Sequence, residues 1–72
     1  MTEHMFGLVR NANERTIKAM ERVANESDGE VWVNGGNIPG NGRMHWFCSR
    51  NRGFPFDQEL AKQIKIKLEN YL

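Results

Sequence analysis

The stretch EVWVNGGNIPGNGRMHWFCS, residues 30–49, decides the fold class of this protein. Its two ends, residues 30–34 and 43–49, are rich in β-branched and aromatic side chains and are bounded by Gly and Asn, a pattern that predicts the two strands of a β-hairpin. The segment between them, residues 35–42, contains four glycines and is longer than a hairpin connection usually requires. We therefore expect a long loop at the tip of the hairpin, either mobile or ordered by a ligand.

An amphipathic helix is predicted on each side of the hairpin. The first helix begins at Asn11, which has the spacing of a capping box with Glu14, and it ends near Gly29. The second helix begins at Asp57 and runs to the end of the sequence. Its apolar stripe is the strongest periodic signal in the chain and consists of Leu60, Ala61, Ile64, Leu68, Tyr71 and Leu72, with Ile66 on the opposite side. The sequence thus predicts an α+β fold in the order helix, strand, strand, helix.

The N-terminal residues 5–9, MFGLV, are compatible with a third strand beside the hairpin. Such a strand would relieve the marginal stability of an isolated hairpin, and the sequence leaves open whether it forms. With 72 residues, we expect one small domain spanning residues 1–72. A core of this size is thin, so a homodimer also stays open.

Composition excludes several classes of protein. The net charge of +1 excludes a strongly basic nucleic-acid coat protein and an acidic tail protein, although residues 43–72 hold the excess of basic side chains. A single cysteine excludes an internal disulfide and favours a reducing compartment. The apolar runs are too short for a signal peptide or a membrane span, so we expect a cytoplasmic protein without a membrane partner.

No catalytic, cofactor-binding or metal-binding motif stands out. The glycine-rich segment lacks the spacing of a phosphate-binding loop and precedes a strand rather than a helix. His45 and Cys48 form the only close pair of metal-ligating or nucleophilic side chains, and their spacing in a strand places them on opposite faces. We therefore expect no enzyme, no cofactor and no metal. An enzyme whose site forms only between chains remains an alternative.

One face of the hairpin is the candidate binding surface. Alternation places Val31 and Val33 on one face, with Met44, Trp46 and Cys48 expected opposite them, and sends Trp32, His45 and Phe47 to the other face. If both helices pack on the first face, the second presents aromatic and Arg side chains, which are typical of protein interfaces and also stack on single-stranded bases. The predicted contact residues are Trp32, Arg43, His45, Phe47, Arg50 and Arg52.

The small size and the near-zero net charge favour a protein partner, and a non-catalytic regulator or inhibitor is the role that we expect. Direct binding of nucleic acid through the same hairpin and the basic second helix is the alternative. Burial of both hairpin faces, by one helix on each side or by the N-terminal segment over Trp32, would remove the surface altogether.

Overall fold

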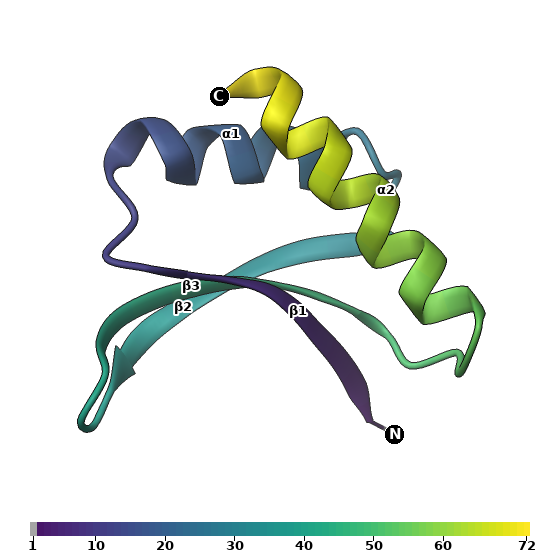
Figure 1. The fold of residues 1–72 in the computed structure, drawn as a ribbon, viewed down its shortest axis with the longest axis horizontal. Coiled ribbons are helices and arrows are strands. Elements are labelled where there is room, and N and C mark those ends of the chain that lie inside the picture. The colour runs from purple at the N-terminus through teal and green to yellow at the C-terminus, as the bar shows by residue number, and fades with distance from the viewer. Residues whose placement is uncertain (1) are drawn as a thin grey trace.

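The computed structural model describes residues 2–72, which form a three-stranded antiparallel sheet and two helices. The elements are β1 (Glu3–Arg10), α1 (Glu14–Asn25), β2 (Val31–Ile38), β3 (Gly42–Arg50) and α2 (Phe56–Tyr71). The order of strands in the sheet is β1-β3-β2. Both helices lie on the same side of the sheet (Figure 1). The predicted α+β class is confirmed, and the N-terminal segment does form the third strand.

The hairpin between β2 and β3 is closed by a tight turn and not by the expected eight-residue loop. The amide of Asn41 donates a hydrogen bond of 2.9 Å to the carbonyl oxygen of Ile38, so Pro39 and Gly40 are the two central residues of the turn. Gly40 has a φ of 83°, the positive value that a type II turn requires at its second central position, and Pro is common at the first. The prediction of a long loop is wrong because this Pro-Gly pair reverses the chain, and the residues from Gly35 to Ile38 belong to β2 and pair with β3.

This turn sets the register of the hairpin. Val33 pairs with Phe47, and Trp32 pairs with Cys48. Directly opposed residues of an antiparallel pair point to the same face, so Phe47 lies on the face of Val33, whereas Trp32 and Trp46 share the other face. The expected pairing of the two valines with Met44, Trp46 and Cys48 is therefore wrong. A shift of one position exchanges the two faces of a strand.

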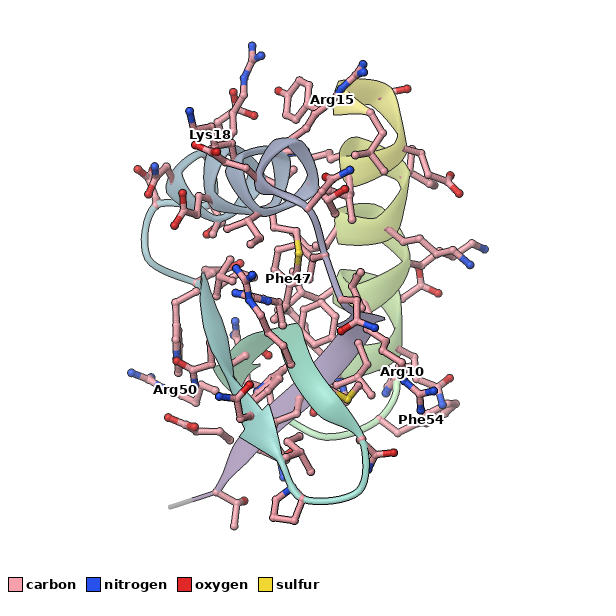
Figure 2. All side chains as sticks on the ribbon, turned by 90° about the vertical axis from the view of Figure 1, so that its left-hand side faces the viewer. Arg10, Arg15, Lys18, Phe47, Arg50 and Phe54 are labelled. Atoms are coloured by element: carbon pink, nitrogen blue, oxygen red, sulfur yellow. The ribbon has the colours of Figure 1, made fainter. Side chains whose placement is uncertain are left out.

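The core lies between the helices and the sheet face that carries Phe47, which is 1% exposed (Figure 2). The stripe of α2 is centred on the buried Ile64, as expected, and Ile66 is exposed. Phe6 of β1 stacks on Phe47 with their ring centroids 5.6 Å apart. The buried cluster consists of Met20, Val23, Ala24, Val31, Phe47 and Ile64.

Helix α1 begins and ends at other residues than the sequence indicates. Its N-cap is Asn13, whose Oδ1 accepts a hydrogen bond of 2.8 Å from the amide of Thr16. Asn11, the predicted cap, instead has a φ of 52° in the turn that joins β1 to α1. The helix stops at Asn25, and Gly29, with a φ of 86°, belongs to the connection to β2.

The connection from β3 to α2 is held by the buried carboxylate of Asp57. Its oxygens accept hydrogen bonds from the backbone amides of Arg52, at 3.1 and 3.2 Å, and of Gly53, at 2.9 Å. Asp57 was expected to begin the helix, which in fact starts one residue earlier, at Phe56. The side chain therefore fixes the loop before α2 and places Arg52 at the end of the sheet.

Candidate functional site

The sheet face opposite the helices is the candidate functional site, because no other element of residues 2–72 packs on it (Figure 1). Residues on this face alternate with those that face the core, and Met5 and Trp32 both pair with Cys48 on the central strand. We call this surface the open face. Its apolar side chains are Met5, Leu8, Trp32, Ile38, Met44, Trp46 and Cys48.

The open face has a buried centre and an exposed apolar rim. Met44 and Cys48 on β3 are buried, although no helix covers them. Trp32 and Trp46 are half-buried, and Met5 and Leu8 on β1 are 65% and 61% exposed. The buried centre of the open face therefore lies on β3, and the side chains of Met5 and Leu8 on the outer strand β1 are left in water.

A hollow of about 300 Å³ lies on the β1 side of the open face. It is lined by Met5, Leu8, Ile38 and Trp46, together with Phe6 and Gly7 of the same strand. The indole nitrogen Nε1 of Trp46 is buried and has no hydrogen-bond partner among residues 2–72. The arrangement offers an apolar depression with a single unsatisfied donor next to it.

Three of the predicted contact residues come together at the β2 side. Trp32, Arg50 and Arg52 line a second hollow, of about 260 Å³, with Phe56 of α2 and Glu30 among its other walls. The guanidinium of Arg52 lies 3.9 Å from the centre of the Phe56 ring, and its Nη1 lies 3.4 Å from Oε1 of Glu30. These contacts hold Arg52 in place on its own chain and partly neutralise it.

The other three predicted contact residues lie elsewhere. Phe47 is in the core and is not available to a partner, which corrects its assignment to the exposed face. His45 shares the helix-covered face, where its ring packs on Gly35 so closely that a Cβ atom there would lie 2.6 Å from it. Arg43 is exposed, but it lies beside the hairpin turn and pairs with Asn37.

The sequence analysis missed Trp46 and the β1 residues of the open face. The position of Trp46 depends on the length of the connection: three residues, Pro39, Gly40 and Asn41, separate the paired residues Ile38 and Gly42, and counting outward from that pair places Trp46 on the face of Trp32. A two-residue turn at Pro39-Gly40 would have placed Trp46 opposite Val33. Met5 and Leu8 share a face although they are three residues apart, since a bulge between Phe6 and Val9 interrupts the alternation. Gly7, with a φ of 68°, is the sequence signal for that bulge.

Among residues 2–72, the pKa values that are shifted belong to two residues at the C-terminal ends of the helices, Glu26 just after α1 and Tyr71 at the end of α2. The hydroxyl of Tyr71 in α2 donates a hydrogen bond to Oε1 of Glu26, which lowers the pKa of Glu26 and raises the pKa of Tyr71. Arg22 of α1 lies 4.1 Å from the centre of the Tyr71 ring and also contacts Glu26. This cluster joins the ends of the two helices and does not form part of the open face.

Within residues 2–72, no group of three or more His, Cys, Asp or Glu side chains is placed to hold a metal ion. The same residues contain no helix that is both long and apolar enough to cross a membrane. Searches of protein-family models, of curated proteins and of solved structures find no match to this chain.

Proposed function

We propose that this protein is a non-catalytic binding module whose open face contacts another protein, as a regulator or inhibitor would. The observation that supports this most is that Trp32 and Trp46 lie on one uncovered sheet face beside the exposed Met5 and Leu8. Large contiguous apolar patches are rare on monomeric proteins, and where they occur they mark interaction sites. Trp, Met and Arg are the residues enriched in protein interfaces.

The charges around the open face favour a protein partner. No strand contains a Lys, and Arg50 lies opposite the acidic residue Glu3 in the register of β1 and β3. Arg52 is engaged with Glu30. Non-specific binding to nucleic acid depends on many Lys and Arg contacts to phosphate, and this face offers few of them.

Binding of single-stranded nucleic acid is the second candidate function. It is favoured by the two tryptophans on one sheet face with Arg10 and Arg50 at opposite ends of the β1–β3 ladder. Aromatic side chains on such a face stack on bases, and flanking Arg side chains contact phosphates. A fall in log affinity with log salt of slope about −0.7 for each phosphate contacted would favour this candidate over the first.

We also propose that the protein acts in the cytoplasm. Its one cysteine is buried as a free thiol, which suits a reducing compartment. A second copy of the chain is an alternative occupant of the open face, and sedimentation of the purified protein over a range of concentrations distinguishes it from a different partner.

The test begins with affinity capture from native extract, with and without nuclease, followed by affinity measurements with the purified partner. Trp46→Ala and Trp32→Ala should each weaken binding by about 2 kcal/mol or more, as truncation of an interface anchor does. Ile66→Ala is the control, because Ile66 is 52% exposed on α2 and lies outside the open face. Equal losses for Ile66→Ala and the tryptophan variants, or capture that nuclease abolishes, would contradict the proposal.

A further inference from the structure

A third hollow, apolar and of about 570 Å³, lies on the helix side of the sheet between β1 and α2. Phe47 and Ile64 of the core form part of its lining, and Ala61 and Leu68 of α2 form one wall. The opposite wall is β1. We call this hollow the β1–α2 groove. It lies on the other side of the sheet from the open face and meets it at Leu8 on the edge of β1, and it takes no part in the function proposed above.

The groove runs along the free edge of β1. Four consecutive residues of the strand, Phe6–Val9, line it. Phe6 and Val9 face the helices and Leu8 faces the other way, so a space that touches all three reaches the edge of the strand. β1 is an edge strand, because β3 flanks it on one side and no strand of residues 2–72 flanks it on the other. Edge strands present backbone groups that can pair with another chain.

The bulge in β1 lies within the stretch that lines the groove. Phe6 pairs with Phe47, and Val9 pairs with His45. Gly7 and Leu8 therefore lie opposite the single residue Trp46, and the extra residue of such a bulge is unpaired in the ladder. Both residues line the groove.

Helix α2 covers the place where one more strand would lie. Its backbone is close to α1 and to β1, but not to β3. β1, α1 and β2 form a split βαβ unit, in which β3 lies between the two parallel strands. The same kind of crossover, from β3 through α2, leads to the position of a further strand on the free side of β1. Figure 1 shows α2 crossing above β1 on that side of the sheet. The groove is the space under the helix at that vacant position.

The charged side chains that line the groove favour one kind of binding segment over others. Lys62 and Lys65 line it and both are exposed, and no acidic side chain from residues 2–72 lines it. Two copies of this chain paired through β1 would bring both lysine pairs to one site, which disfavours a second copy. A segment with carboxylates beside its apolar side chains complements the groove.

We propose that the β1–α2 groove binds an extended, acidic and apolar segment of a partner protein, which adds a fourth strand at the edge of β1. Backbone hydrogen bonds to β1 hold the segment, as in other cases of β-strand addition. Its apolar side chains on the helix side fill the space above Phe47 and Ile64. Its carboxylates at the ends of that face reach Lys62 and Lys65.

The probe for this proposal is the capped peptide Glu-Thr-Val-Thr-Val-Thr-Glu, which presents valines flanked by carboxylates on one face. Its binding is followed by the amide chemical shifts of the full chain, and the shifts should change at residues 6–9 and 61–68. The matched peptide with Lys in place of Glu should bind at least about tenfold more weakly, because it places like charges together. Trp32→Ala should bind the probe as the parent does, which separates this site from the open face.

Two further comparisons test the charge and the backbone contacts. The double variant Lys62→Glu, Lys65→Glu should bind the probe at least about tenfold more weakly, whereas Lys67→Glu, on the same helix but outside the groove, should change affinity by less than about twofold. Of two probes N-methylated on alternate residues, only one should lose binding, since residues of one parity face β1.

Absence of saturable binding up to about 1 mM probe would overturn the proposal, since a dissociation constant above that concentration does not indicate a specific site. Equal affinity of the Glu and Lys peptides, or of the two N-methylated probes, would overturn it as well.

Discussion

Trp46 and Phe47 are neighbours in β3, and they lie on opposite faces of the sheet. Phe47 is at the centre of the core, under both helices. Trp46 is half-buried on the open face, where no helix of the described chain reaches it. Both are large aromatic residues of the same strand, so the difference between them comes from what packs above each. The hydrophobicity of a strand residue therefore does not tell which face the helices cover.

The covered face also differs in how closely its rings approach the backbone. A Cβ atom on Gly7 would lie 2.8 Å from Cδ2 of Phe47, and one on Gly35 would lie 2.6 Å from the His45 ring. Glycine at these two positions allows aromatic side chains of β3 to lie flat over the neighbouring strands. The helices can then pack on a surface without protruding side chains.

The largest expected effect is that of Phe47→Ala. Removal of this buried ring should lower the free energy of unfolding by about 3–5 kcal/mol, since a core cavity is left behind. Urea denaturation measures the loss, with Trp46→Ala as the matched variant from the other face. A smaller loss for Phe47→Ala than for Trp46→Ala would contradict the assignment of the two faces.

Gly7→Ala should lower the free energy of unfolding by about 1–3 kcal/mol, because the new methyl group meets the Phe47 ring at a backbone position of positive φ. Gly36→Ala is the control: a Cβ there meets no atom within 4 Å, and its φ is not positive. The same denaturation experiment compares the two variants. Equal midpoints would mean that Phe47 does not lie over β1 as described.

Trp46→Ala should cost about 1–2 kcal/mol of stability, less than a fully buried side chain, because part of the indole is already in water. This loss sharpens the comparison with Phe47→Ala: Trp46 is the larger of the two side chains, yet its removal should lower the free energy of unfolding by less. The variant should still unfold cooperatively in urea. Unfolding of this variant under native conditions would show that the open face is part of the core.

Trp32→Ala should mainly increase the access of reagents to Cys48 and should change the free energy of unfolding to a lesser extent. The thiol is buried beside Trp32 and Met5, its cross-strand partners on the open face. Reaction with a thiol reagent should be slow in the parent and about tenfold faster in the variant, since exposure controls access to the thiol. Met20→Ala on the helix side controls for a general loss of stability. If only Met20→Ala accelerated the reaction, Cys48 would face the helices.

The smallest expected effect concerns the pH dependence of stability. The folded-state pKa of Glu26 lies below its ordinary value of 4.5 because of the hydrogen bond from Tyr71, so the unfolded chain binds the proton more readily. The contribution of this carboxylate is present above its ordinary pKa and is lost as the pH falls through the lowered one. Tyr71→Phe should reduce the difference between the urea midpoints at about pH 7 and about pH 3. An unchanged difference would contradict this role for the pair.

The sequence predicts most of the local structure, because the local structure depends on patterns that span only a few residues. The 3.6-residue period of α2 is visible in the chain and locates Ile64 at the centre of the packed stripe, as the structure confirms. The turn was also present in the sequence as Pro39-Gly40, but four glycines in the segment favoured a long loop over a tight turn. Phe47 was moved to the wrong face because three residues connect the paired Ile38 and Gly42, whereas the expected connection has an even number of residues, and this difference exchanges the two faces.

The sequence by itself determined the α+β class, the two amphipathic helices and the strand-forming character of the hairpin, because periodicity and side-chain shape act over a few residues. Only the tertiary structure decided which face is covered. Both faces of β3 carry large apolar side chains, Met44 and Trp46 on one and Phe47 on the other, so alternation gives no preference. The choice depends on the packing of α1 and α2, and these contacts join residues far apart in the chain.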